Sequence, residues 1–438
     1  MATEQVDTET GGKSPGEPSA QPPERSLWRN PDFGKYLVGY TASDFGHQIS
    51  TVAIPLVAVL TVGANSFEVG LMRSANQVPY LLFALFFGVA VDRWRRGRML
   101  VFADIGRALA LGLIPIAYAL DRLGVPALVL VAFLVGTCSV LFDVSSQAYV
   151  PRLVDRDQLA HGNSIMESLR SASLIAGPAA GGVFVGWFSP PNALTACVVF
   201  FLISAGTIWL IRTAEPRPEP VADDGPGAIA KIGEGFKLVF GNPILRSVVG
   251  IVAMFNFTYA AYLAIYVVYL PVELKLSSYS IGLVFAAAGP GLLVGALFSS
   301  WLPKRFGYGR VLNLSAIMSC LFLFGVSLLH GNGFVTVAVL VLLNFLYGAL
   351  GQTFIVALLG IRQSITPDKM LGRVTATYRF VGVGPVPLGS MLGGLLGEEV
   401  GLRPALFSVT LTMTFVSSLY LFSALRTIGR ELPTAVDA

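Results

Sequence analysis

Charged side chains inside long apolar runs are the residues of this sequence best suited to chemistry. Asp44 interrupts the first such run about two helical turns from its start, with no lysine or arginine close to it in the sequence. A charge in the middle of a bilayer is costly, so an ionisable residue there is a functional hypothesis by default. A buried carboxyl group can exchange protons near neutral pH. Asp44 is therefore a candidate for proton coupling, and the alternative is a structural carboxyl group satisfied by a neighbouring span.

Two acid–base pairs also lie in apolar runs, each with a spacing of three residues. Asp104 precedes Arg107, and Glu167 precedes Arg170. Residues three apart face each other on a helix, so both spacings predict ion pairs. Asp104 and Glu167 are further candidates for proton coupling, and a purely structural ion pair is the alternative that the spacing favours for Asp104.

The composition indicates the elements that must hold these charges. The chain has 438 residues, of which 54% are hydrophobic and 13% are charged, whereas soluble proteins carry about 25% charged residues. A polytopic membrane protein is the expected class. The basic residues are spread over short loops, which argues against nucleic-acid binding. No GxxxxGK[ST] phosphate-binding loop or soluble catalytic domain is recognisable, so we expect no enzyme activity.

Metal and cofactor binding are not expected. The cysteines lie inside apolar runs, as small core residues do, and the histidines are too far apart in sequence to form a ligand motif. These residues are Cys138, Cys197, Cys320, His47, His161 and His330.

Twelve apolar runs between residues 36 and 425 are long enough to cross a bilayer as helices, which takes about 20 residues each. The longest polar gap divides them six and six, and it contains a segment that is either a short surface helix or a plain linker. The predicted organisation is a disordered tail at 1–32, a six-helix half at 33–212, a linker at 213–243, a second six-helix half at 244–427 and a tail at 428–438.

The distribution of basic residues predicts the orientation. If the N-terminus is cytoplasmic, nearly all loop lysines and arginines fall on the cytoplasmic side, and only Arg122, Lys275 and Arg403 fall on the other. Cytoplasmic loops are enriched in Lys and Arg. We therefore expect a multi-pass protein of the cell membrane with both termini in the cytoplasm.

The two halves are related by an internal repeat. A shift of 212 residues carries Arg93 onto Arg305, Asp44 onto Asn256, and the segment at 66–71 onto 278–283. Two parallel halves related by an axis along the membrane normal are a transporter design in which substrate binds between the halves near the midplane.

The loop between the second and third runs carries a recognisable motif. The residues are Gly88, Asp92, Arg93, Arg96 and Arg98. They resemble the signature loop of the major facilitator superfamily, and the resemblance extends over residues 33–428. It implies twelve transmembrane helices in two pseudo-symmetric halves. It also implies that this loop is a latch for the outward-facing state, with Asp143 as the partner of Arg93. The alternative is an ordinary basic cytoplasmic loop.

The fifth run contains a second motif, Gly177-Pro178-Ala179-Ala180-Gly181-Gly182. Small residues four apart allow a second helix to approach closely, and Pro178 kinks the helix. The string resembles the antiporter motif of proton-coupled exporters in the same superfamily, and this resemblance favours efflux. Residues 43–48 around Asp44 also resemble the first span of macrolide- and enterobactin-exporter-like members.

A set of polar and aromatic side chains is expected to line a large amphiphilic pocket. Such a pocket suits a bulky, partly apolar substrate better than a sugar. The alternative is that the aromatic residues only fill space in the helix packing. The candidates are Gln48, Gln77, Asn256, Tyr259, Tyr262, Tyr266, Asn344 and Gln352.

We therefore expect a monomeric transporter that exchanges protons for an amphiphilic small molecule, such as a drug, antibiotic or siderophore, and exports it by alternating access. Uptake on the same fold is one alternative. A membrane receptor or scaffold that does not transport is the other.

Overall fold

The computed structural model describes residues 27, 30–154, 158–213, 228–367 and 370–433. The secondary structure of this part of the chain is entirely helical, which confirms the predicted all-α class. Ten helices are long and apolar enough to cross a membrane. Two others, α2 and α5, have 28 and 29 residues and lie packed among them, in agreement with a twelve-span bundle.

The first half is a bundle in which α1 packs on α5 and α6, while α4 packs on α2 and α3. A π-helical turn over Ala58–Val62 extends its first helix. The helices are α1 (Pro31–Val57), α2 (Ser66–Arg93), α3 (Arg96–Ala119), α4 (Val125–Leu153), α5 (Leu159–Trp187) and α6 (Pro190–Trp209).

The second half repeats this plan with two of its spans interrupted. One breaks at Ala287, and the other breaks at Gly384-Pro385, where proline cannot donate a backbone hydrogen bond. The helices are α8 (Pro243–Val272), α9 (Ser278–Ala286), α10 (Ala288–Phe298), α11 (Trp301–Phe306), α12 (Tyr308–Ser327), α13 (Phe334–Ser364), α14 (Leu371–Val383), α15 (Val386–Glu399) and α16 (Leu402–Ser418), followed by two 3-10 turns.

One further helix, α7 (Ala228–Gly241), precedes the second half and packs on α14. The ring of Phe236 meets that of Phe380 edge-on, and Glu234 pairs with Arg373. The polar gap of the sequence therefore contains a helix that is held against the second half.

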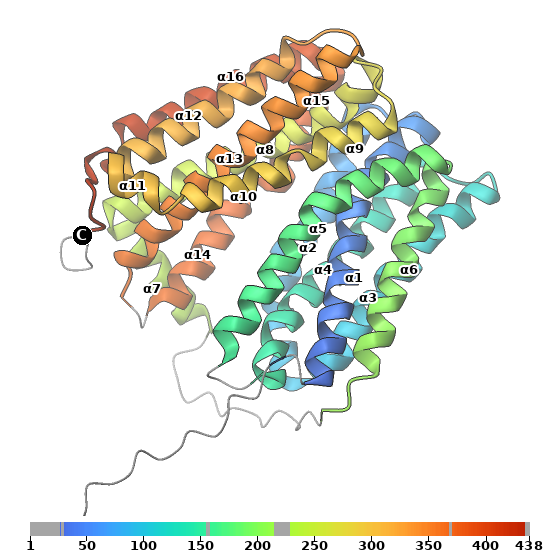
Figure 1. The fold of residues 1–438 in the computed structure, drawn as a ribbon, viewed down its shortest axis with the longest axis horizontal. Helices are drawn as coiled ribbons and strands as arrows, with labels where there is room; N and C mark the ends of the chain where they lie inside the picture. The colour runs from blue at the N-terminus through green and yellow to red at the C-terminus, as the bar shows by residue number, and fades with distance from the viewer. Residues whose placement is uncertain (1–26, 28–29, 155–157, 214–227, 368–369, 434–438) are drawn as a thin grey trace, which may run out of the picture.

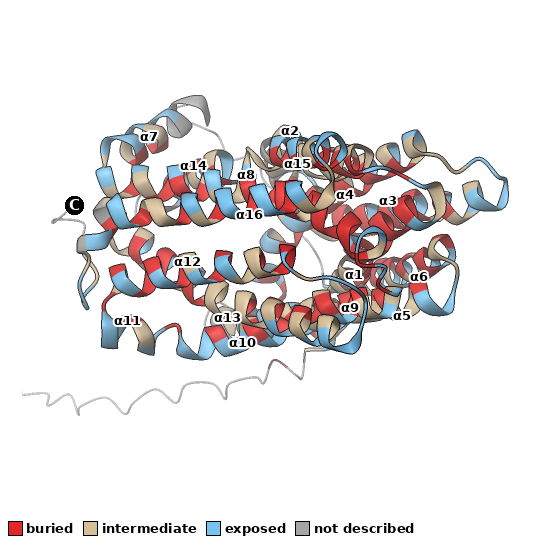
Figure 2. Ribbon diagram, turned by 90° about the horizontal axis from the view of Figure 1, so that it is seen from above, coloured by how far each residue is buried: buried red, intermediate tan, exposed pale blue. Residues whose placement is uncertain are grey.

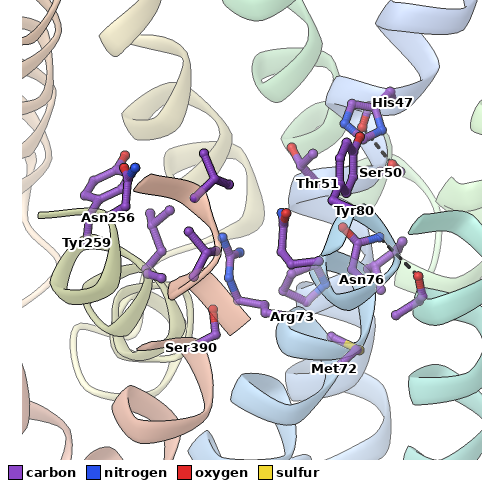
Figure 3. A pocket seen from close by; sticks show the side chains of 18 residues that line it. His47, Ser50, Thr51, Met72, Arg73, Asn76, Tyr80, Asn256, Tyr259 and Ser390 are labelled. Atoms are coloured by element: carbon purple, nitrogen blue, oxygen red, sulfur yellow. Dashed lines mark hydrogen bonds between the residues drawn. The ribbon is translucent and has the colours of Figure 1, made fainter. Parts of the chain in front are cut away.

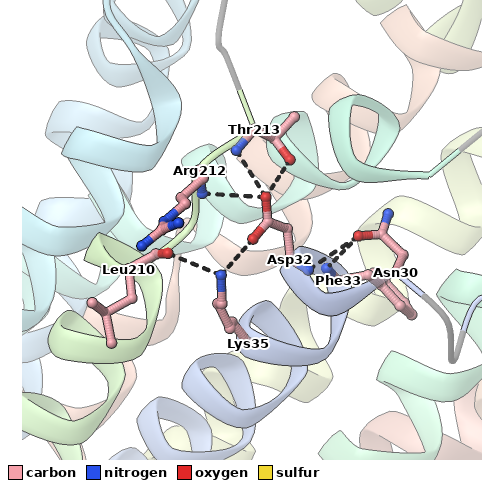
Figure 4. A network of polar contacts seen from close by, with 7 residues as sticks. All are labelled: Asn30, Asp32, Phe33, Lys35, Leu210, Arg212 and Thr213. Carbon is pink, nitrogen blue, oxygen red and sulfur yellow. Dashed lines mark hydrogen bonds and ion pairs between the residues drawn. The ribbon is translucent and has the colours of Figure 1, made fainter.

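The start of α1 is tied to the end of α6. Asp32 accepts hydrogen bonds from the backbone N–H and the hydroxyl of Thr213, at 2.8 and 2.7 Å (Figure 4). Lys35 donates to Asp32 and to the Leu210 carbonyl, at 2.7 and 3.0 Å. The carboxylate and the ammonium group thus satisfy backbone groups that the end of α6 leaves open.

The outer surface of the bundle is apolar. Figure 2 shows exposed residues along the outer faces of helices such as α12 and α16, with buried residues between the helices. Large apolar side chains such as Phe86, Leu297 and Phe334 are 69, 76 and 88% exposed. So extensive an apolar surface requires an apolar surrounding, which fits a multi-pass membrane protein.

The two halves meet through α2 with α15 and α5 with α9. In Figure 1 they touch near α9 and diverge toward the end where α7 and α14 lie. Glycines make the contacts possible, because a Cβ atom at Gly182 would lie 2.6 Å from the Gly282 Cα, and one at Gly70 would lie 3.0 Å from the Gly394 Cα. The interface is therefore closed at one end of the bundle.

Candidate functional site

A cavity of about 370 Å³ lies between the halves. Helices α1, α2 and α4 form one wall, and α8, α14 and α15 form the other (Figure 3). Both polar and apolar side chains line it. The polar ones are His47, Ser50, Thr51, Arg73, Asn76, Gln77, Tyr80, Asn256, Tyr259 and Ser390. A mixed lining of this size suits an amphiphilic small molecule.

Three of the expected cavity residues line this space: Gln77, Asn256 and Tyr259. The Asn256 amide also donates to the Gly382 carbonyl at 2.8 Å, which fastens α8 to the end of α14. Tyr259 stacks on Tyr347 with ring centroids 5.7 Å apart.

The other expected cavity residues lie outside this lining. Tyr262 and Tyr266 are stacked in the core of the second half, with centroids 4.9 Å apart, and Asn344 donates to the Tyr266 hydroxyl at 3.0 Å. Tyr259, Tyr262 and Tyr266 share one face of α8, which lines the cavity at Tyr259 and is buried in the hydrophobic core at Tyr262 and Tyr266. Gln48 packs on Gly177, and Gln352 packs on Gly295.

Seven polar lining residues are not among the cavity residues expected from the sequence: His47, Ser50, Thr51, Arg73, Asn76, Tyr80 and Ser390. His47 could have been found, because it follows Asp44 by three residues and so lies on the same side of α1. Arg73 could have been found as a cation inside an apolar run. The Nδ1 atom of His47 is buried and makes no hydrogen bond within the described structure.

Asp44 is half-buried on α1, beside Ser173 of α5. The charges that act on it are those of Arg170, Asp143 and Arg107. Its Oδ2 atom is buried and has no hydrogen-bond partner among the described residues. Asp44 therefore places a carboxyl group with one buried, unpaired oxygen at the contact between α1 and α5.

Asp104, by contrast, is fully buried and well satisfied. It pairs with Arg107, and it accepts hydrogen bonds from the hydroxyls of Ser43 at 3.0 Å and Ser204 at 2.5 Å. The Arg107 guanidinium also lies over the rings of Phe142 and Phe201, at 4.4 and 4.5 Å. This network joins α1, α3, α4 and α6, and its geometry is that of a structural brace.

Glu167 and Arg170 form a bidentate ion pair on an exposed part of α5. The Arg170 Nη2 lies 2.6 Å from Glu167 Oε1, and its Nε lies 3.0 Å from Oε2. Arg170 is also the basic residue with the largest charge effect on Asp44.

The expected partner of Arg93 is engaged elsewhere. The Tyr80 hydroxyl donates to Asp143 at 2.8 Å. Arg93 follows Tyr80 by thirteen residues on the same helix, so it lies about 20 Å further along at 1.5 Å per residue. The structure therefore does not bring Arg93 and Asp143 together, because the register of α2 against α4 places Tyr80 opposite Asp143.

The remaining loop residues lie at the end of α2 and the start of α3. Arg93 and Arg98 are exposed, and Arg96 is half-buried. A Cβ atom added at Gly88 would meet open space. The side chain of Asp92 lies outside the described part of the structure.

The glycine motif of α5 packs against two different helices. Gly177 contacts Gln48 of α1, and a Cβ at Gly181 would lie 3.2 Å from the Ile49 carbonyl oxygen. Gly182 faces Gly282 of α9 in the other half. Pro178 is buried within the same helix. The motif therefore sits where Asp44's helix and the partner half both touch α5.

No metal site is formed by the described residues, since no three His, Cys, Asp or Glu side chains gather as ligands there. The thiols of Cys138, Cys197 and Cys320 are free.

Comparison with known proteins shows a single family. The model of the Major Facilitator Superfamily matches residues 36–382 and 251–436. The multidrug efflux pump Tap of Mycolicibacterium fortuitum is 23% identical over 393 residues, covering 86% of this chain and 92% of its own. The staphyloferrin A transporter of Staphylococcus aureus is 24% identical over 347 residues, which cover 78% of this chain and 84% of that transporter.

Solved structures share the fold at low identity. The nucleoside transporter NupG has a TM-score of 0.71 at 12% identity, covering 89% of this chain and 98% of its own. A bacterial homologue of the iron transporter ferroportin, in an inward-facing state, has a TM-score of 0.68 at 15% identity. The match covers 89% of this chain and 98% of that homologue.

Proposed function

The chain belongs to the Major Facilitator Superfamily, and from that premise we propose that it exports an amphiphilic small molecule in exchange for protons by alternating access. The observation that carries the proposal is Asp44, whose buried Oδ2 lacks a hydrogen-bond partner among the described residues. The other two candidate acids already have partners. Asp104 accepts hydrogen bonds from two serines, and Glu167 pairs with Arg170 on an exposed surface.

Proton binding at Asp44 would change how α1 sits against α5. The helices are in close contact there, because Gly177 and Gly181 present backbone to Gln48 and Ile49. Uptake of a proton removes the cost of a buried negative charge, and a difference in proton affinity between two states shifts their populations. Since His47 follows Asp44 and lines the cavity, substrate and proton would bind within a few residues of each other.

The basic loops support a cytoplasmic location for both termini in the cell membrane. With that orientation, the end at which the halves diverge faces the cytoplasm, and the conformation is inward-facing. A single copy contains both walls of the cavity, which supports a monomer with halves at 33–212 and 244–427, a linker at 213–243, and tails at 1–32 and 428–438.

Two resemblances to known exporters support export over uptake. The motif from Gly177 to Gly182 resembles that of antiporters, and a relative covering most of the chain is a multidrug efflux pump. The cavity lining, with polar and apolar side chains in comparable measure, supports a drug-like or siderophore-like substrate over a sugar.

The test is transport in inside-out vesicles with an imposed pH gradient, in which candidate substrates dissipate the gradient as they enter. Vesicles with wild-type protein should accumulate substrate only when their lumen is acidic. The initial rate of accumulation should be roughly tenfold lower, or lower still, with Asp44→Asn. Glu399→Gln, an exposed acid outside the cavity, is the matched control.

Substrate entry that ignores the gradient would refute proton coupling. Gradient-driven movement of substrate out of these vesicles would indicate uptake in the cell. If no compound moves and Asp44→Asn alters no flux, the receptor or scaffold role would take precedence.

A further inference from the structure

Arg73 is a cation in the central cavity that has no counter-charge among the described residues. It lies on α2, lines the cavity and points into the space between α2 and α8 (Figure 3). Its Nε atom is buried without a hydrogen-bond partner, and no described carboxylate pairs with it. A buried donor without a partner is costly, and no carboxylate among the described lining residues balances the charge of Arg73.

No acid from the described part of the chain shares the cavity with Arg73. Among the residues that line it, Arg73 is the one that is always charged, and the other titratable ones are His47, Tyr80 and Tyr259. Three carboxyl groups on the helices that form the walls have other partners or neighbours, and Glu68 of α2 is held by the backbone of Asn65 at 2.9 Å. Asp44 lies beside Ser173 of α5, and Asp143 is held by the Tyr80 hydroxyl at 2.8 Å.

We infer that the ligand of this cavity is an amphiphilic anion whose carboxylate, sulfonate or phosphate group binds Arg73. This inference rests on the proposed function, in which the cavity holds the substrate. A planar guanidinium matches such groups with two parallel hydrogen bonds. The anion would supply the counter-charge that the described protein lacks.

The surroundings of Arg73 fit the rest of such a molecule. Ser390, Gln77 and Tyr259 line the same cavity as Arg73 and offer polar groups to such a ligand. The apolar body of the ligand would contact the apolar part of the cavity wall, which is formed by Ile54, Pro55, Met72, Leu263 and Val386.

A second cavity carries the same sign of charge. It has a volume of about 390 Å³, lies within the second half and shares Asn256 with the first. Its charged lining residues are Arg362 and Arg379, and the Arg362 guanidinium lies 4.3 Å from the centre of the Tyr378 ring. Cavities lined by one sign of charge concentrate ligands of the opposite sign, so this neighbouring cavity favours anions as well.

A matched pair of fluorescent probes tests the inference. 8-Anilinonaphthalene-1-sulfonate and N-phenyl-1-naphthylamine share an aromatic body, and the first carries a sulfonate. Binding is measured at equilibrium to purified protein in nanodiscs of phosphatidylcholine, which has no net charge to compete, with empty nanodiscs subtracted. The variants are Arg73→Gln, Arg73→Lys and, as a control, Arg122→Gln in an exposed loop.

Arg73→Gln should weaken binding of the sulfonate roughly tenfold or more, since it removes hydrogen bonds to a charged group. Arg73→Lys should recover part of that loss and show that the site is still folded. Binding of the neutral probe should change less than twofold in every variant, and Arg122→Gln should match wild type. Equal weakening of both probes, or no weakening of either, would overturn the inference.

Transport separates this inference from the proposed function. If the sulfonate binds through Arg73 but a pH gradient does not drive its transport, the anion site stands and proton-coupled export fails. If the gradient drives the sulfonate equally well in wild type and Arg73→Gln, export stands and the anion site fails.

Discussion

Gly182 of α5 and Gly282 of α9 bring the two halves into backbone contact, and a second glycine pair repeats this contact. A Cβ at Gly182 would lie 2.6 Å from the Gly282 Cα, and Gly70 faces Gly394 in the same way. The 212-residue repeat carries Gly70 onto Gly282 and Gly182 onto Gly394. The halves are thus held at one end by two contacts related by the pseudo-symmetry of the repeat.

A side chain at this contact should open that end. Gly182→Val would overpack the α5–α9 interface, which typically costs about 1–3 kcal/mol. The ratio of the state in which α5 and α9 are separated to the state in which they touch should rise roughly tenfold. A cysteine introduced at Thr51, in the cavity, should then react faster with an impermeant maleimide added outside the cell.

Gly186→Val is the matched control for this experiment. Gly186 lies one turn further along α5, where an added Cβ meets open space, so its labelling rate should equal that of wild type. Equal rates for the Gly182 and Gly186 variants would show that the glycine contact does not hold the halves together.

Asp104 should matter for stability, whatever its role in transport. Asp104→Asn leaves the buried Arg107 without its carboxylate, and breaking a buried pair costs about 3–5 kcal/mol. We expect a clearly lower thermal unfolding midpoint for the purified protein in detergent. Replacing both residues by leucine should recover much of the loss, because no uncompensated charge remains.

Glu167→Gln serves as the comparison for the Asp104 variant, since its ion pair is exposed and such pairs contribute little. An Asp104→Asn protein as stable as wild type would argue that this network is not a brace.

The loop between α2 and α3 should affect the rate of conformational change. If Asp92 contributes to a latch that closes the cytoplasmic end, Asp92→Asn should slow turnover severalfold while substrate affinity stays within twofold. Turnover would be compared with that of Arg122→Gln, which alters a charge in the loop between α3 and α4. Unchanged turnover in Asp92→Asn would remove Asp92 from the mechanism.

Much of the architecture could be predicted from the sequence, because hydropathy and loop charge are local properties. The apolar runs predict the helical spans, and the helical fold and the family match bear out that class. The breaks at Ala287 and at Gly384-Pro385 could not be predicted from hydropathy, because an interrupted span has the same hydropathy as a continuous one.

What the sequence by itself determined was which side chains carry charge within the membrane and that the halves repeat. Only the tertiary structure decided which of those charges have partners. Asp104 meets Ser204 one hundred residues away, Asp143 meets Tyr80 instead of Arg93, and Arg73 meets no carboxylate among the described residues. These outcomes depend on the rotation and register of one helix against another, which side-chain packing sets and which no single apolar run contains.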